Sequence, residues 1–164
     1  SFLKGFGSGN ISAYMHPSGT LFIGGTDRGW GARGGKRFAI DRVTWKNKVP
    51  FEIHEMRAKP DGFELTFTHE VDAKTASDLK SYSMSAYTYI YQSKYGSPVV
   101  DKLNPEILGA EVTGPKTVRV TVDKLTKGHV HELQAKGVRS LDNKPILHPI
   151  GYYTLNEIPP AEVN

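Results

Sequence analysis

The chain has 164 residues, enough for one domain of ordinary size or for a small domain with part of another. It contains no cysteine, which excludes disulfides, thiolate metal sites, a cysteine nucleophile and covalent haem attachment within the chain. Its 21 basic and 17 acidic residues give a net charge of +4 without a long basic run, so the composition does not favour nucleic-acid binding.

The first 45 residues predict short β-strands on either side of a glycine-rich loop. Apolar residues alternate around 11–25 and again in 37–45, and Pro17 and Gly19 are placed to reverse the chain. The loop from Gly24 to Lys36 contains six glycines. Two or three strands cannot bury both faces of a sheet, so this segment either packs on the rest of the chain or belongs to a larger sheet assembly.

The pattern changes near residues 46–50, where charged residues and Pro50 interrupt it. From Phe51 onward apolar residues recur with a period of two, in short runs separated by Gly, Pro, Asn and Asp. Seven strands in little more than a hundred residues predict an all-β chain with an immunoglobulin-like β-sandwich. The predicted strands are 51–57, 62–68, 82–92, 107–114, 117–123, 129–136 and 151–157.

One short helix is predicted, in residues 72–82. Asp72 is placed to cap it, and Ala76 and Leu79 are expected to pack against the core. No apolar run is long enough to span a membrane, so we expect no membrane insertion. Because the first residue is Ser1 rather than Met, we expect a processed or excised piece whose export signal lay upstream.

Several blocks of the sequence, in order, resemble one bacterial family. The blocks 18–45, 49–72, 82–98, 127–140 and 151–159 resemble the end of the β-propeller in glucose/sorbosone-dehydrogenase-like proteins. The resemblance implies that residues 1–46 are the last propeller blade, that 49–159 are the immunoglobulin-like module after it, and that 160–164 are a tail.

This family implies a location and a function. Its members are large exported proteins related to sugar dehydrogenases that use pyrroloquinoline quinone (PQQ), often fused to a cytochrome c domain. The resemblance therefore implies a periplasmic or extracellular, non-catalytic C-terminal module that packs against the rest of the propeller, or another chain of it, and helps to recognise substrate. PQQ, calcium and haem are expected in the parent protein and not in this chain, because one blade lacks the central channel that would hold a quinone.

The glycine-rich loop carries the candidate cofactor-binding residues Arg28, Trp30 and Arg33. In a complete propeller they would offer an anion-binding fork beside a stacking ring, suited to an anionic cofactor or a sugar. The alternative is a structural loop in which Trp30 fills a gap and the arginines meet carboxylates. A nucleotide loop is excluded, because its glycine spacing requires a helix to follow and here a strand is predicted.

Tyr87, Tyr89 and Tyr91 alternate along one predicted strand and so share a face, with Tyr95 close behind. Three readings stay open for this row: docking onto a propeller, stacking on a saccharide, or coverage by the module's own loops. The opposite face of the strand is expected to line the core, through Tyr82, Met84, Ala86 and Ile90.

His129 and His131 share a face with Leu133 at the start of another predicted strand. They are candidate metal ligands, but the sequence places no third ligand beside them. The alternative is a pair of partly buried, hydrogen-bonded histidines. Catalytic residues are not predicted, since no GxSxG motif marks a hydrolase nucleophile.

Overall fold

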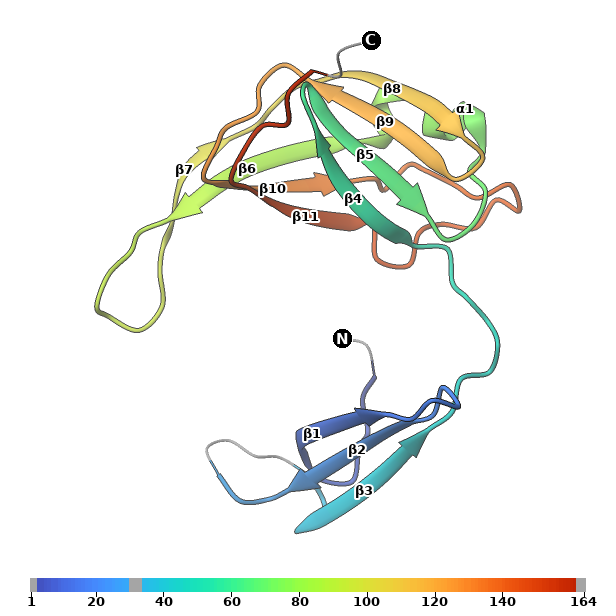
Figure 1. Ribbon diagram of the computed structural model, residues 1–164, viewed down its shortest axis with the longest axis vertical. Helices are drawn as coiled ribbons and strands as arrows, with labels where there is room; N and C mark the ends of the chain where they lie inside the picture. The colour runs from blue at the N-terminus through green and yellow to red at the C-terminus, as the bar shows by residue number, and fades with distance from the viewer. Residues whose placement is uncertain (1–2, 30–33, 162–164) are drawn as a thin grey trace. The chain divides into compact units, whose positions relative to one another are not determined.

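The computed structural model describes residues 3–29 and 34–161, and the chain divides into two compact units, Ser1–Lys48 and Val49–Asn164 (Figure 1). Within these described ranges the strands form three antiparallel sheets, one of three strands and two of four. The prediction of an all-β chain with a sandwich is confirmed. The assignment of the first unit to a propeller blade stays a prediction.

The first unit is a sheet of β1 (Gly9–Met15), β2 (Leu21–Thr26) and β3 (Phe38–Val43), with β2 in the middle. The predicted turn between β1 and β2 is present. The amide of His16 donates to the carbonyl oxygen of Thr20 at 2.9 Å, and Gly19 has a φ of 80°, a conformation that favours glycine.

One face of this sheet is uncovered. Tyr14 lies opposite Phe22 in the register of β1 and β2, while Phe38 and Ile40 on β3 lie opposite Thr26 and Gly24. Because paired residues share a face and alternate residues do too, Tyr14, Phe22, Phe38 and Ile40 point to the same side. We call this set the uncovered face. Tyr14 is 60% exposed, Phe38 68% and Ile40 82%.

The other side of the sheet is partly covered by the segment that precedes β1. The amide of Gly7 donates to Asp41 Oδ2 at 2.9 Å, and Ser8 Oγ donates to the carbonyl of Lys36 at 2.9 Å. Ile23 is the single buried hydrophobic side chain in the described part of this unit. The unit therefore has almost no core of its own.

The second unit is a sandwich of two antiparallel sheets of four strands each. One sheet has the order β4-β5-β9-β8 and the other β11-β10-β6-β7. Lettered A to G along the chain, with β7 as C′, these are the ABED and GFCC′ sheets of an immunoglobulin-like fold. The strands are β4 (Ile53–Lys59), β5 (Gly62–Phe67), β6 (Ser83–Tyr89), β7 (Val99–Leu103), β8 (Ile107–Gly114), β9 (Thr117–Val122), β10 (His129–Gln134) and β11 (Ile150–Leu155).

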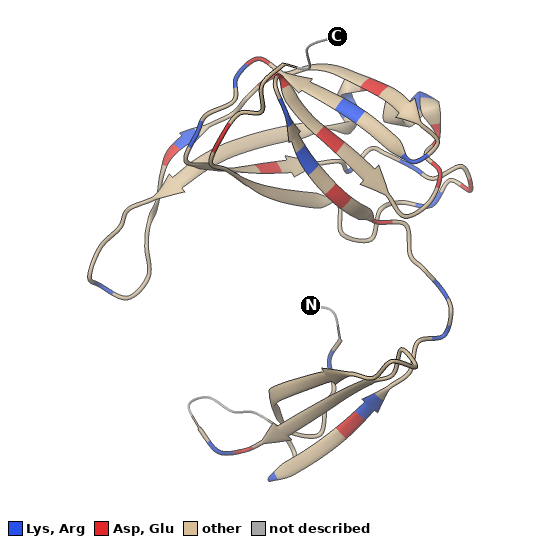
Figure 2. Ribbon diagram, viewed as in Figure 1, with Lys and Arg blue, Asp and Glu red and all other residues tan. Residues whose placement is uncertain are grey.

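The core lies between the two sheets and is built from alternate residues of the strands. On β5 the side chains of Phe63, Leu65 and Phe67 are buried, as the alternation predicts. The inward residues of β9 and β6 join them: Val118, Val120, Val122, Met84 and Ala86. Charged residues of both signs are spread over both sheets of this unit and do not gather in one place (Figure 2).

The predicted short turn of helix is present as α1 (Ala73–Ala76), and it begins at the predicted cap, where Asp72 Oδ1 accepts from the amide of Thr75 at 2.9 Å. Two other sequence-based expectations about this unit are wrong. Leu79 falls in the 3₁₀ turn η1 (Leu79–Ser81) and is exposed, not packed on the core. Ile90 is also exposed, because β6 ends at Tyr89 and its alternation stops there.

Strand β7 was not predicted from the sequence. Asp101, with a φ of 51°, and Lys102 lie opposite the single residue Tyr87, so this edge strand carries a β-bulge. The bulge breaks the alternation on which strand prediction depends. The helical segments α1 and η1 are single turns, and no helix in the described residues has the length and apolar character needed to cross a membrane.

Candidate functional site

The predicted tyrosine row is divided between a strand and a loop. Tyr87 and Tyr89 lie on β6, with ring centroids 5.7 Å apart and an interplanar angle of 89°, an edge-to-face pair. Tyr87 is partly buried and Tyr89 is exposed. Tyr91 and Tyr95 are fully exposed and lie in the loop that joins β6 to β7 and projects from the sandwich (Figure 1). The direction of Tyr91 is therefore not set by the alternation of a strand.

Further polar and aromatic side chains share the outward side of the β11-β10-β6-β7 sheet with Tyr87. Glu132 on β10 lies opposite Ser85 of β6 on one side and Tyr152 of β11 on the other. Val130, two residues earlier, lies opposite Tyr87, so all of these side chains point outward. We call this surface the tyrosine face. It holds a shallow pocket lined by Ser85, Ala86, Tyr87, Val99, Lys102, Asn104 and Glu132.

The tyrosine face couples Tyr87 to its neighbours electrostatically. Burial raises the pKa of Tyr87 above its ordinary value, and a hydrogen bond with Tyr89 and the negative charge of Glu132 act in the same direction. Glu132 Oε1 accepts a hydrogen bond from Gln134 Nε2 at 3.0 Å. This environment therefore favours the neutral form of the Tyr87 phenol.

The sequence offered only part of this site. The alternation of β10 places Glu132 away from the core, but nothing in the sequence says that β10 pairs with β6, or in which register. Lys102 lies in the β7 bulge and Asn104 follows β7, and the sequence does not signal the bulge. Tyr152 could have been predicted to point outward, because successive residues of β11 alternate between the core and the outer face of the sheet.

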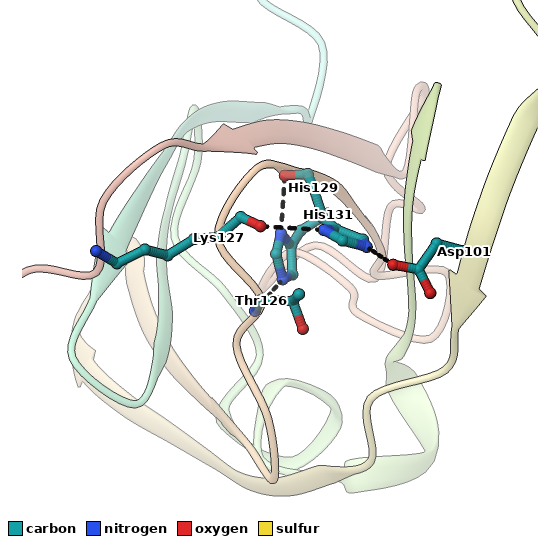
Figure 3. Close-up of polar contacts among 5 residues, drawn as sticks. All are labelled: Asp101, Thr126, Lys127, His129 and His131. Atoms are coloured by element: carbon teal, nitrogen blue, oxygen red, sulfur yellow. Dashed lines mark hydrogen bonds and ion pairs between the residues drawn. The ribbon is translucent and has the colours of Figure 1, made fainter. Parts of the chain in front are cut away.

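Both candidate metal ligands are buried and hydrogen-bonded within the sandwich (Figure 3). His129 Nδ1 lies 3.1 Å from the carbonyl of Lys127, and its Nε2 lies 2.9 Å from Asp101 Oδ2. His131 Nε2 accepts from the amide of Thr126 at 3.4 Å, and its Nδ1 lies 3.3 Å from the carbonyl of His129. All four ring nitrogens thus have partners, which suits histidines that organise this end of the core.

The environment of His131 favours its neutral form. Burial lowers the pKa of this imidazole below its usual value. Since Nε2 faces an N–H donor and Nδ1 faces a carbonyl, the neutral ring protonated on Nδ1 satisfies both contacts. In the described part of the chain no group of three His, Asp or Glu residues is placed to hold a metal ion.

The glycine-rich loop is described only in part. Asp27 and Arg37 close its base, since the amide of Asp27 donates to the carbonyl of Arg37 at 2.8 Å and their side chains lie 3.8 Å apart. Arg28 is exposed. Trp30 and Arg33 lie outside the described residues, so the fork expected from these three side chains stays a prediction.

No family model matches this sequence, and no curated protein matches it either. Solved structures similar to the chain are pieces of a bacterial surface-layer protein, SbsC. The N-terminal part of SbsC is 19% identical, with a TM-score of 0.50 over 66% of this chain and 24% of that one. SbsC domains 1–6 are 21% identical, with a TM-score of 0.51 over 69% of this chain and 14% of that one.

The chain thus spans between about a seventh and a quarter of the length of these SbsC structures. At this level of identity the similarity concerns the fold alone.

Proposed function

We propose that the chain is a non-catalytic β-module of a larger exported protein. In this proposal the first unit joins a larger sheet assembly, the terminal blade of a β-propeller, and the sandwich is an immunoglobulin-like module attached to it. Dehydrogenase chemistry with PQQ then belongs to the other blades of the parent protein. The module's work is to complete and stabilise the propeller.

The observation that carries the proposal is the uncovered face of the first unit. Tyr14, Phe38 and Ile40 expose most of their surface on one side of a sheet that buries a single hydrophobic residue among those described. Large exposed apolar faces mark interaction surfaces, and exposed apolar area costs about 25 cal/mol per Å² relative to burial. A sheet this small needs a covering layer to be stable.

The covering layer we propose is another β-sheet. The uncovered face carries aromatic and β-branched side chains at regular sheet spacing, with the exposed Arg42 opposite Phe22 at one end of it. Apart from that arginine, it is the kind of surface that packs face to face with a second sheet about 10 Å away. Adjacent propeller blades pack in this way, and the family resemblance of residues 18–45 points to the same architecture.

An exported location is part of the proposal. The sugar-dehydrogenase-like proteins that the sequence resembles are exported, and the similar solved structures are parts of a surface-layer protein. Both point outside the cytoplasm, to the periplasm or the cell surface.

Hydrogen exchange on the 164-residue chain tests whether the first unit needs a partner. We expect amides of β1, β2 and β3 to exchange much faster than those of β5, β9 and β10, because little apolar surface holds the first unit together. Slow, sandwich-like exchange in the first unit of the monomeric chain would contradict the proposal.

Substitution of the uncovered face tests the partner itself in the parent protein. Ile40→Ser should lower the stability of the parent by about 1.5–3 kcal/mol, the value of one buried aliphatic side chain, while leaving the sandwich of the isolated chain unchanged. Leu147→Ser is the matched control, since Leu147 is an exposed aliphatic residue of the second unit. Equal effects of the two substitutions in the parent would argue against a covered face.

A further inference from the structure

The pocket on the tyrosine face combines an aromatic wall with several polar side chains. Tyr87 forms the apolar wall, and Ser85, Lys102, Asn104 and Glu132 contribute a hydroxyl, an ammonium, an amide and a carboxylate. These side chains come from the adjacent strands β10, β6 and β7 and from the residue after β7. The bulge in β7 brings its polar side chains to the same side of the sheet as Tyr87.

Most of the hydrogen-bonding capacity of these groups is unused within the described chain. The side chains of Ser85, Lys102 and Asn104 have no hydrogen-bond or ion-pair partner among the residues described. Glu132 uses Oε1 to accept from Gln134, which leaves Oε2 available in the same part of the structure. The pocket therefore has several donors and acceptors for a bound molecule.

We infer that the tyrosine face binds a neutral saccharide chain, with one sugar ring stacked on Tyr87 and its hydroxyls bonded by Ser85, Lys102, Asn104 and Glu132. This site is distinct from the uncovered face, and the inference does not depend on the function proposed above.

The chemistry of the pocket favours this ligand class over others. A sugar ring has an apolar face of C–H groups that packs on an aromatic ring, and an edge of hydroxyls that donate and accept, which matches a tyrosine beside mixed polar groups. A phosphate or other anion is disfavoured, because the single cation, Lys102, is balanced by Glu132. A purely apolar ligand would leave these polar groups desolvated without partners.

The surrounding aromatic residues extend the site beyond one ring. Tyr152 on β11 lies two strands from Tyr87 on β6 and, being in register with Ser85, two residues further along, a separation of about 12 Å from the strand spacing and the rise per residue. On the other side Tyr89 continues β6 toward the projecting loop that carries Tyr91 and Tyr95. A ligand of several sugar units could contact more than one of these rings, so we expect a polysaccharide to bind better than a monosaccharide.

Affinity electrophoresis of the 164-residue chain tests the inference. The probes are soluble forms of a β-glucan, xylan and galactomannan as neutral polysaccharides, with polygalacturonate as the anionic one. We expect retardation by at least one neutral polysaccharide, with little dependence on salt because charge contributes little. No retardation by any of the three would overturn the inference, as would salt-sensitive binding to polygalacturonate alone.

Four variants tell a built site from general stickiness. Tyr87→Ala should bind about tenfold more weakly, whereas Tyr87→Phe, which keeps the ring, should bind within about threefold of the parent chain. Lys102→Met, on an exposed residue, tests the polar contacts and should weaken binding even if Tyr87→Ala does not fold. Tyr14→Ala is the matched control, an exposed tyrosine of the other unit, and should have no effect.

The same variants reveal a protein partner if one occupies this face instead. Sedimentation of the chain over a range of concentrations would then show self-association that Tyr87→Ala abolishes, together with no polysaccharide binding. That result would refute the saccharide and assign the tyrosine face to a contact between copies of the chain. Polysaccharide binding equally reduced by Tyr14→Ala would also refute the inference.

Discussion

Removing the hydroxyl of Tyr82 should destabilise the sandwich by a measurable and localised amount. The hydroxyl donates to the carbonyl oxygen of Ala76 at 2.7 Å, and both residues are buried. Tyr82→Phe deletes the donor and keeps the ring, so the carbonyl loses its partner without a large cavity. A buried polar group left unsatisfied costs about 1–3 kcal/mol, a considerable part of the 5–15 kcal/mol of a typical domain.

Urea unfolding of the 164-residue chain, followed by tyrosine fluorescence together with circular dichroism, measures this cost. With a slope of about 2 kcal/mol per molar urea, Tyr82→Phe should lower the unfolding midpoint by roughly 0.5–1.5 M. The matched control is Tyr153→Phe. Tyr153 packs against Phe63, with ring centroids 5.6 Å apart, but its hydroxyl has no hydrogen bond within the described residues.

Alkaline pH adds a second signature of the same contact. Burial raises the pKa of Tyr82 above its ordinary value of 10. Above pH 10 the unfolded chain therefore loses a proton that the folded chain retains, so this residue's contribution to stability is present below pH 10 and declines above it. The difference in unfolding midpoint between the unsubstituted chain and Tyr82→Phe should therefore narrow as pH rises past 10. Identical midpoints for Tyr82→Phe and Tyr153→Phe at pH 7 would refute the reasoning.

Three further predictions concern the sandwich. Because burial lowers the pKa of His131 below 6.5, the unfolded chain binds a proton before the folded chain as pH falls. The free energy of unfolding should therefore drop below about pH 6.5, by at most about 1.4 kcal/mol per pH unit. Urea titrations at pH 7 and pH 5 should show a smaller difference between the two pH values for His131→Gln than for the unsubstituted chain. Gly62→Ala should unfold the sandwich or lower its stability by more than about 3 kcal/mol, because the new Cβ would overlap the carbonyl of Val120. Gly114→Ala should be tolerated, since its Cβ would meet Thr117 at ordinary contact distance, and thermal melts compare the two variants. Asp72→Ala should cost about 1 kcal/mol in the same assay through loss of the helix cap, and Asp72→Asn, which keeps an acceptor, should recover most of it.

Strands with unbroken alternation were predictable, because burial on one side imposes a period of two. Residues 107–114 were predicted with the bounds that β8 has, and 62–68 and 117–123 each end one residue beyond β5 and β9. The alternation fails where the backbone departs from regular pleating. The bulge at Asp101 hid β7, and the end of β6 at Tyr89 moved Tyr91 out of the strand.

The site was less predictable than the fold, because it depends on pairing between distant segments. Tyr87 could be singled out as an outward aromatic, but Glu132 and Tyr152 join it only through the order β11-β10-β6 and its register. The sequence of a strand does not specify which strand it pairs with, so side chains 20 to 65 positions apart in sequence are brought together by the sheet topology alone. His129 shows the same limit, since its partner Asp101 lies 28 positions away on the unpredicted strand.

The bulge in β7 also bears on how the protein behaves when many copies are crowded together. A straight strand at the margin of a sheet presents a row of free amides and carbonyls, to which a second molecule can add its own strand and begin a fibril. At Asp101 and Lys102 this margin bends, and it sets two charges of opposite sign where an incoming strand would have to align. The local irregularity that makes β7 hard to predict from the sequence thereby disfavours the addition of a foreign strand at this edge of the sandwich.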